Sequence, residues 1–184
     1  FKPQKYAIIM VLKNRIFASI EADFSPFIKL RISLGFSQNI IMNNKKKITI
    51  IGGGAAGFFC AANLDENKFN VTILEQNQDV LQKVKISGGG RCNVTHACFD
   101  PRELVKFYPR GNKELLSVFS KFQPGDTMAW FAQRNISLKI ENDNRIFPES
   151  NSSQTIIDCF LKEVQTKNFE IKTQSVVLEI QKLE

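Results

Sequence analysis

The 184-residue chain has little of the chemistry that metal and redox sites need. It contains one histidine, one tryptophan and four cysteines, and no two cysteines form a C-x-x-C pair. His96 therefore has too few suitably spaced partners for a zinc site, and no metal site is expected. Cys92 and Cys98 are separated by five residues, which argues against a redox pair and fits reduced cytosolic thiols. Cys60 and Cys159 lie in apolar helical stretches and are expected in the core.

Long hydrophobic runs are also missing. The longest apolar run near the start, residues 6–12, has seven residues, whereas a membrane-spanning helix needs about 20. No small-residue cleavage site of a secretory signal follows this run. We therefore expect a cytoplasmic protein without a membrane partner. Hydrophobic residues make up 43% of the chain, which is typical of a globular protein.

The chain is basic, with a formal net charge of +7. Residues 1–41 hold six Lys/Arg and two Asp/Glu, and the remaining excess is spread over residues 42–184 apart from a lysine cluster at 45–47. We find no basic surface pattern interleaved with aromatic residues, which is the usual sign of a nucleic-acid surface. Nucleic acid is therefore not expected as a partner.

The most informative stretch is residues 48–57, which reads Ile-Thr-Ile-Ile-Gly-Gly-Gly-Ala-Ala-Gly. A β-branched run enters a G-x-G-x-x-G turn, the pattern that binds the pyrophosphate of a dinucleotide. Gly52 would allow the tight turn, Gly54 would let the backbone approach the pyrophosphate, and Gly57 would let the next helix pack on the strand. The helix N-terminus would point its N–H groups at the phosphates. Because no Lys-Ser/Thr pair follows, a nucleoside-triphosphate loop is disfavoured.

An acidic residue follows at the distance that this motif requires. After an apolar helical stretch at 58–64 and a polar turn at 65–68, a second strand at 71–74 ends in Glu75, 23 positions after Gly52. A carboxylate about 20 residues on can accept the ribose hydroxyl protons and would repel a 2′-phosphate. This favours FAD or NAD over NADP, and the alternative is a solvated acid at a strand end.

A second glycine-rich loop lies at residues 87–93, Ser-Gly-Gly-Gly-Arg-Cys-Asn. Three consecutive glycines cannot maintain a regular helix or strand, so they indicate a backbone that comes very close to something. Arg91 is a planar cation suited to phosphate oxygens, and Asn93 adds a donor and an acceptor. We expect a second phosphate-facing loop, with a flexible linker as the alternative.

The rest of the sequence favours an α/β fold with a Rossmann-like parallel sheet and flanking helices. The chain ends after strand-like sequence, so we expect this fold to be cut short at its C-terminus. The predicted elements are helices over 101–108, 113–122 and 126–135, a strand at 138–140, a helix with its apolar face at 156–164, and strands at 171 and 176–178.

Residues 1–41 do not fit this pattern. They show no clear periodicity and carry five of the sixteen phenylalanines, and Met42 just ahead of the first strand looks like a natural start. Our hypothesis is that 1–41 is a non-native or poorly ordered extension. Residues 42–184 would then be the N-terminal part of an FAD/NAD(P)-binding domain.

With both glycine loops in view, residues 46 to about 180 resemble the N-terminal portion of a bacterial family of conserved flavoproteins, described as NAD(P)/FAD-dependent oxidoreductases. Some members are associated with reduction of bile-acid dehydro-intermediates, and others are labelled aminoacetone oxidases. The matching pieces are 52–57, Glu75, 85–95 and 145–150. The resemblance implies an FAD-binding Rossmann-like fold and FAD-dependent oxidoreductase activity of the whole protein, with this chain inactive alone.

The resemblance also implies the cofactor contacts. The first loop would hold the FAD pyrophosphate and Glu75 the adenosine ribose. Lys83, Arg91 and Asn93 would contact the phosphates, the ribitol or the flavin, and the backbone around Val177 the adenine. The expected cofactor-binding residues are Gly52, Gly53, Gly54, Ala55, Ala56, Gly57, Glu75, Lys83, Gly89, Gly90, Arg91, Asn93 and Val177.

Two positions differ from the family pattern, and the alternatives stay open. His96 replaces a usual Asn, and Asn144 replaces a usual Gly at a position where Asn can still adopt the left-handed conformation. His96 is a candidate acid or base by residue type only. FAD is the expected cofactor, with NAD(P)H as a candidate electron donor and an unidentified small-molecule substrate. The alternatives are a nicotinamide-only dehydrogenase, a non-catalytic dinucleotide-binding fragment, and a flavoprotein acting on transfer RNA.

Overall fold

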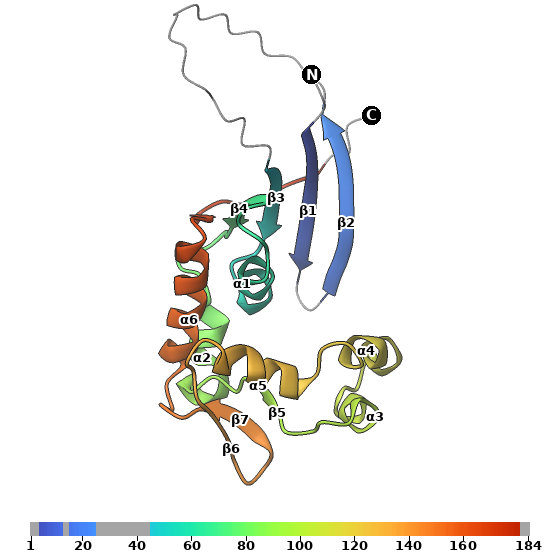
Figure 1. Ribbon diagram of the computed structural model, residues 1–184, viewed down its shortest axis with the longest axis vertical. Coiled ribbons are helices and arrows are strands. Elements are labelled where there is room, and N and C mark those ends of the chain that lie inside the picture. The colour runs from blue at the N-terminus through green and yellow to red at the C-terminus, as the bar shows by residue number, and fades with distance from the viewer. Residues whose placement is uncertain (1–3, 13–14, 25–44, 181–184) are drawn as a thin grey trace, which may run out of the picture. The chain divides into compact units, whose positions relative to one another are not determined.

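The computed structural model describes residues 4–12, 15–24 and 45–180 (Figure 1). The chain divides into two compact units, each with a sheet of its own. Unit 1 comprises Phe1–Val80 and Glu163–Glu184, and unit 2 comprises Leu81–Lys162.

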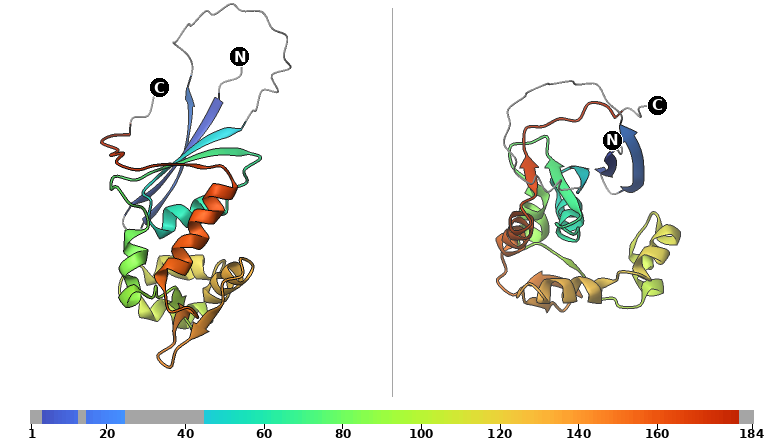
Figure 2. Two further views of the ribbon diagram at one scale, coloured as in Figure 1. Left: turned by 90° about the vertical axis from the view of Figure 1, so that its left-hand side faces the viewer. Right: turned by 45° about the horizontal axis from the view of Figure 1, so that its top comes forward.

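Unit 1 is built on a five-stranded sheet in the order β2-β1-β3-β4-β8. All neighbouring strands are parallel except β1 and β2, which form an antiparallel pair. The strands are twisted relative to one another, as the left view of Figure 2 shows. This confirms the predicted Rossmann-like α/β fold with a parallel sheet. The strands are β1 (Gln4–Leu12), β2 (Arg15–Phe24), β3 (Lys46–Ile51), β4 (Phe69–Leu74) and β8 (Glu170–Lys172).

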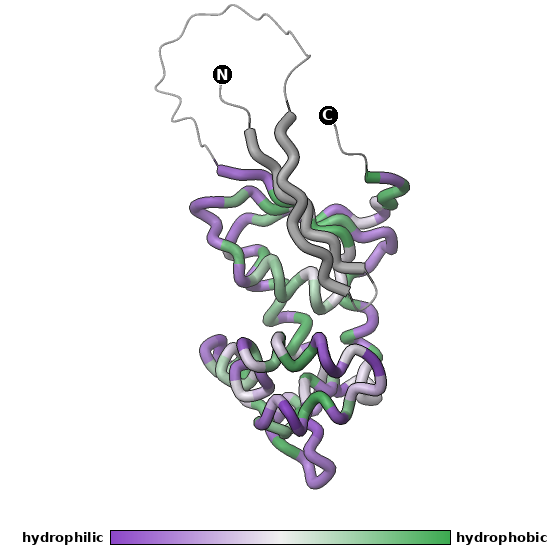
Figure 3. Tube along the Cα trace, turned by 90° about the vertical axis from the view of Figure 1, so that its right-hand side faces the viewer, coloured by the Kyte–Doolittle hydropathy of each residue, from purple (hydrophilic) through white to green (hydrophobic). Residues whose placement is uncertain are grey.

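The core of unit 1 lies between the two central strands and helix α1 (Ala55–Ala62). Ile48 and Ile50 alternate on β3 and are buried, as are Val71 and Ile73 on β4. Full burial of such side chains contributes about 1.5–3 kcal/mol each. Figure 3 shows green, hydrophobic stretches within the sheet that give way to purple, hydrophilic loops. From α1 the chain contributes Phe58, Ala61 and Ala62 to this core.

A lysine from the second segment of unit 1 closes the end of α1. The Lys167 ammonium donates hydrogen bonds to the carbonyls of Ala62 at 2.6 Å and Leu64 at 2.7 Å. Carbonyls at a helix C-terminus lack intrahelical donors and carry a partial negative charge. A partly buried ammonium therefore satisfies them and ties the segment after α6 (Ser153–Thr166) to the first βαβ unit.

Residues 1–41 were not expected to form a regular element, whereas the structure has β1 and β2 there. β1 pairs in parallel with β3, with Tyr6 opposite Lys47 and Met10 opposite Ile51. The positions 1–3, 13–14 and 25–44, including the proposed start at Met42, lie outside the described residues. Whether 1–41 is native to the protein stays a prediction.

Unit 2 combines short helices with a small antiparallel sheet in the order β5-β7-β6. Its core includes Trp130, Phe131 and Phe160, whose ring centroids lie 4.9–6.0 Å apart, together with Ile146 and Phe147 of the sheet. Besides the first part of α6, its elements are α2 (Gln82–Gly90), β5 (Thr95–His96), α3 (Pro101–Leu104), η1 (Val105–Phe107), α4 (Asn112–Phe119), α5 (Pro124–Ala132), β6 (Leu138–Ile140) and β7 (Arg145–Pro148).

The predicted helices and the strand at 138–140 are confirmed with small shifts of their ends. The first helix divides into α3 and η1, and Asp100 caps it by accepting the N–H groups of Arg102 and Glu103. The predicted strand at 176–178 is wrong, because β8 ends at Lys172 and residues 173–180 pair with no strand in the described part of the chain. Asn144 adopts a φ of 63°, as expected. Among the described helices, none is long and apolar enough to span a bilayer.

Candidate functional site

The turn between β3 and α1 contains one tightly packed glycine, Gly57, and one glycine that faces open space, Gly54. A Cβ at Gly57 would lie 2.1 Å from the Gly52 carbonyl oxygen, so only glycine lets the helix start this close to the strand. A Cβ at Gly54 would meet nothing within 4 Å, and Gly54 is exposed. Gly52 itself has a φ of 108°, which favours glycine. The roles predicted for Gly52 and Gly57 in the turn are thus consistent with the geometry, and Gly54 leaves space beside the backbone.

The first turn of α1 begins with backbone N–H groups for which no acceptor is found among the described residues. Gly54 is the N-cap residue, no side chain caps the helix, and the first turn holds no acidic residue. Ala55 and Ala56 are both exposed. Unpaired N–H groups and the positive end of the helix dipole favour an anion at this point. The turn can therefore receive a phosphate group.

Glu75 is bound to the glycine turn that precedes it by 22 residues. Its Oε2 accepts the Gly53 N–H at 2.7 Å, and its Oε1 accepts the backbone N–H and the side-chain amide of Asn77 at 2.9 and 2.7 Å. An ionised carboxylate offers about four acceptor sites, so these three donors leave capacity for about one more. Glu75 therefore shapes the turn, a role that the sequence analysis did not foresee. Gly53 is buried here, and a Cβ on it would lie 2.8 Å from Val80 Cγ1.

The predicted adenine contact follows a segment that runs beside Glu75. The Glu75 N–H donates to the carbonyl of Lys172, and the Ser175 N–H donates to the Glu75 carbonyl, both at 2.8 Å. Val177, two residues further on, is half-buried. The backbone before Val177 is thus held at the carboxyl end of β4, within unit 1.

The second glycine loop is a turn in which all three glycines adopt left-handed conformations, consistent with the expectation that they interrupt regular structure. Ser87 is extended, and Gly88, Gly89 and Gly90 have φ values of 57°, 69° and 84°. The Cys92 N–H closes the turn by donating to the Ser87 carbonyl at 2.9 Å. The three glycines therefore end the regular part of α2.

The faces of this second turn differ. A Cβ at Gly88 would lie 2.7 Å from the Asn93 nitrogen and 2.8 Å from a ring carbon of the buried Phe147. A Cβ at Gly89 or Gly90 would meet nothing within 4 Å, and both residues are exposed. Gly88 is therefore needed for packing, whereas Gly89 and Gly90 leave an open backbone face that a ligand can approach.

Arg91 is committed to protein partners in this structure. Its Nη1 donates to Glu141 Oε1 at 2.5 Å, its Nη2 donates to Oε2 at 3.4 Å, and its guanidinium carbon lies 3.9 Å from the centre of the Phe147 ring. A two-pronged ion pair combined with ring stacking fixes the arginine plane. Sequence reasoning missed Glu141, because nothing local to either residue signals a pair 50 positions apart.

Asn93 also bonds to protein groups, whereas Lys83 makes no hydrogen bond or ion pair with the part of the chain that the structure describes. With its amide nitrogen toward the neighbouring carbonyls, Asn93 donates to Thr95 at 2.9 Å and to Ile146 at 3.3 Å. Lys83 is exposed on the regular part of α2. The Ser153 hydroxyl donates to the Lys85 carbonyl at 2.8 Å and anchors the end of this helix. The two glycine loops belong to different units, so their joint use stays a prediction.

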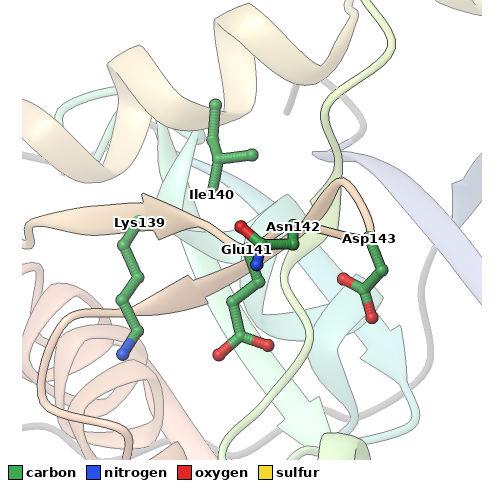
Figure 4. A pocket seen from close by; sticks show the side chains of 5 residues that line it. All are labelled: Lys139, Ile140, Glu141, Asn142 and Asp143. Carbon is green, nitrogen blue, oxygen red and sulfur yellow. The ribbon is translucent and has the colours of Figure 1, made fainter.

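The tip of the β6–β7 hairpin forms a shallow hollow of about 440 Å³ lined by residues 139–143 (Figure 4). The Lys139 and Glu141 side chains point to one side and Ile140 to the other. The Arg145 backbone N–H and then its side chain lower the pKa of the Asp143 carboxyl, which stays ionised. Of the predicted residues, none lines this hollow, and Glu141 links it to Arg91. A second open hollow of about 600 Å³ lies between residues 128–138 and Glu149.

The described residues contain no group arranged as an acid–base pair. The ring of His96 packs against Phe107 with centroids 4.5 Å apart, and its Nδ1 is buried without a hydrogen-bond partner among residues 45–180. Burial raises the pKa of the Cys92 thiol, which therefore stays protonated at neutral pH. No group of three or more His, Cys, Asp or Glu side chains in that range is placed to bind a metal.

Comparisons with known proteins place this geometry in context. The chain is 29% identical over 128 residues to the ribosomal RNA dihydrouridine synthase of Escherichia coli (strain K12), covering 70% of the chain and 31% of that protein. It is 26% identical over 149 residues to the ribosomal RNA dihydrouridine synthase of Haemophilus influenzae (strain ATCC 51907 / DSM 11121 / KW20 / Rd), covering 81% of the chain and 34% of that protein. It is 30% identical over 130 residues to the 3-dehydro-bile acid delta(4,6)-reductase of Clostridium scindens (strain ATCC 35704 / DSM 5676 / VPI 13733 / 19), covering 69% of the chain and 31% of that protein.

The chain thus spans about a third of the length of these curated relatives. Residues 46–184 match the HI0933-like protein Rossmann domain. This match begins at β3 and includes both glycine loops. Because it covers well over half of the sequence, the chain belongs to the HI0933-like family and carries its Rossmann domain.

Proposed function

We propose that this chain supplies the dinucleotide-binding part of an FAD-dependent oxidoreductase. The observation that carries the proposal is the contrast within the first turn, where Gly57 is sealed against the strand and Gly54 faces open space at a helix N-terminus. A side chain at Gly54 would add bulk only where a ligand would lie. Membership of the HI0933-like family supports the same assignment.

The residues present fit FAD in this role. The first turn would bind the pyrophosphate through backbone N–H groups, and the remaining acceptor capacity of Glu75 would take a ribose hydroxyl proton. Within unit 2, Gly89 and Gly90 leave a backbone face open to a ligand, with Lys83 as an exposed cation on the preceding helix, and their use by the same cofactor stays a prediction. Arg91 and Asn93 would act mainly by holding that turn in shape, since both already bind protein groups. The segment before Val177 would border the adenine.

Bound FAD would supply hydride transfer, while this part of the protein supplies binding and orientation. The names of the relatives suggest the class of reaction. A dihydrouridine synthase adds two hydrogens across a carbon–carbon double bond of uracil, and a delta(4,6)-reductase reduces a carbon–carbon double bond of a bile acid. We propose that the whole protein saturates a carbon–carbon double bond conjugated to a carbonyl group, with a uracil in RNA as the leading substrate. A reduced nicotinamide, NAD(P)H, would provide the two electrons.

The test is the visible absorption spectrum of the full-length natural protein, recorded as purified and after addition of FAD. We expect flavin bands that survive gel filtration and that bleach when NAD(P)H is added without oxygen. A colourless protein that gains no flavin absorbance but binds NADH would instead support a nicotinamide-only dehydrogenase. A protein that binds neither would support a non-catalytic fragment. Cell fractionation would test the expected cytoplasmic location.

A further inference from the structure

A surface of unit 2 combines basic and aromatic side chains and contributes almost nothing to the core. We name residues 105–122, which form η1, α4 and their flanking turns, the α4 surface. Not one of these residues is buried, and α4 has no buried position. Helices α3 and α4 lie side by side (Figure 1).

The charge of the α4 surface is strongly of one sign. It carries four cations and one anion, Glu114, for a net charge of +3 over 18 residues. Arg110, Lys113 and Lys121 are exposed, and none makes an ion pair within the described part of the chain. The fourth cation, Lys106, pairs with Glu103 of α3 at 2.7 Å, a contact that is more than half exposed. Three cations are thus available to an anionic partner.

Aromatic rings lie between these cations in the sequence. Phe107 is 61% exposed, although one side of it packs on His96, and Tyr108 is 40% exposed and packs on Phe119. Large aromatic side chains at this exposure are uncommon on a monomeric surface. We expected no basic pattern interleaved with aromatic residues, but residues 106–110 form such a run in the sequence itself, and the structure shows that its side chains are exposed. The expectation against nucleic acid therefore does not extend to this surface.

We infer that the α4 surface binds single-stranded RNA. Arg110, Lys113 and Lys121 would contact phosphates, and Phe107 and Tyr108 would stack against unpaired bases, the combination that single-strand binding proteins use. An acidic protein would use the cations without needing the exposed aromatic rings, and an anionic membrane, which can use both, is tested separately by the vesicle experiment below. The surface itself is inferred from burial and charge, and only the choice of RNA among polyanions rests on the proposed function with its uracil substrate.

The experiment is fluorescence anisotropy of a labelled oligouridine of about 12 nucleotides with the full-length protein, without added flavin, at several salt concentrations. Single-strand binding weakens with salt by a slope of about 0.7 per phosphate contact. The triple variant Arg110→Gln/Lys113→Gln/Lys121→Gln should therefore lower the slope by about 2. Phe107→Ala and Tyr108→Ala should each weaken binding on the order of 10-fold, and Tyr108→Phe should keep it.

The matched control is Lys46→Gln/Lys85→Gln/Lys162→Gln, which removes the same charge from exposed positions outside the α4 surface. The control should keep the parent slope and affinity. An equal loss in both triple variants, or no RNA binding at about 50 mM salt, would overturn the inference. The inference would also be overturned if the protein bound phosphatidylglycerol vesicles tightly through the same residues but did not bind RNA. Flavin absorbance is recorded separately, so a colourless protein that still binds RNA through this surface refutes only the proposed function.

Discussion

The Glu75 carboxylate and the Gly53 amide are joined by a 2.7 Å hydrogen bond that links the end of β4 to the middle of the glycine turn. The bond is partly buried, and Asn77 holds the other carboxylate oxygen. The acid that the dinucleotide motif assigns to the ribose thus also supports the loop assigned to the pyrophosphate. We therefore expect one side chain to support the shape of the loop and to make the proposed ribose contact.

Glu75→Ala should reduce both stability and cofactor binding. Loss of an acceptor that is charged and partly buried should lower the free energy of unfolding by about 1.5–3 kcal/mol, because the Gly53 N–H is left without a partner. Glu75→Gln keeps one acceptor oxygen and should give an intermediate loss. Urea unfolding measures the stability, and flavin fluorescence titration of the full-length protein measures binding. An alanine variant with parental stability would show that the bond does not support the turn.

Gly54→Val should mainly reduce flavin binding, whereas Gly57→Ala should mainly reduce stability. The valine side chain introduced at position 54 would enter open space, so the free energy of unfolding should change by at most about 1 kcal/mol, the range of N-cap preferences. The same side chain should abolish flavin retention. The smaller change at Gly57 places a methyl group 2.1 Å from a carbonyl oxygen and should cost about 3 kcal/mol or more. Thermal unfolding and the flavin-to-protein absorbance ratio separate the two. A Gly54→Val protein that keeps its flavin would refute the role of this turn.

Within the second turn, Gly88→Ala should be more damaging than Gly90→Ala. Both residues have positive φ values, so each alanine carries a conformational cost of about 1–2 kcal/mol. Only the Gly88 methyl group also collides with the Asn93 backbone and the Phe147 ring, which adds about 1–3 kcal/mol. Chemical denaturation of the two variants provides the measurement. Equal losses would mean that the turn does not pack on Phe147 as described.

Arg91 and Glu141 should show a measurable coupling in a double-mutant cycle. Their side chains are 32% and 27% exposed, so solvent screening reduces the interaction to about 1 kcal/mol, and it should weaken at high salt. The control pair is Lys106 and Glu103, which is 67% and 57% exposed and should couple by a few tenths of a kcal/mol at most. The cycle is measured by urea unfolding of Arg91→Ala, Glu141→Ala and the double variant. A coupling no larger than that of the control would leave Arg91 available for a phosphate.

Local backbone requirements were predictable from the sequence. Gly52, Gly57 and the three glycines at 88–90 occupy conformations or contacts that other residues would disturb, so their spacing carries structural information. The same holds for the helices, whose apolar spacing and caps are properties of contiguous residues. Partners distant in sequence were not predictable. The Arg91 pair depends on the β6–β7 hairpin returning beside the second turn, and only the folded chain brings this about.

The strand errors have the same cause. A β-branched run at 176–178 predicts a strand, yet a strand needs a neighbour with free backbone groups, and the described sheet offers none beyond Lys172. Conversely, residues 4–12 pair with β3 although their pattern gave no signal in isolation. A continuous apolar run without alternation is common in strands of a parallel sheet, so periodicity does not reveal it.

The hydrogen bonds from Lys167 to the end of α1 have a consequence for biosynthesis. Unit 1 is assembled from two stretches of chain with all of unit 2 inserted between them. During translation β4 can pair with β8 only after residues 170–172 leave the ribosome. The Lys167 ammonium can likewise reach the end of α1 only at that stage. Unit 2 is complete by then, and such late long-range pairing is slow compared with local folding. We expect unit 2 to fold first and unit 1 to complete its sheet afterwards.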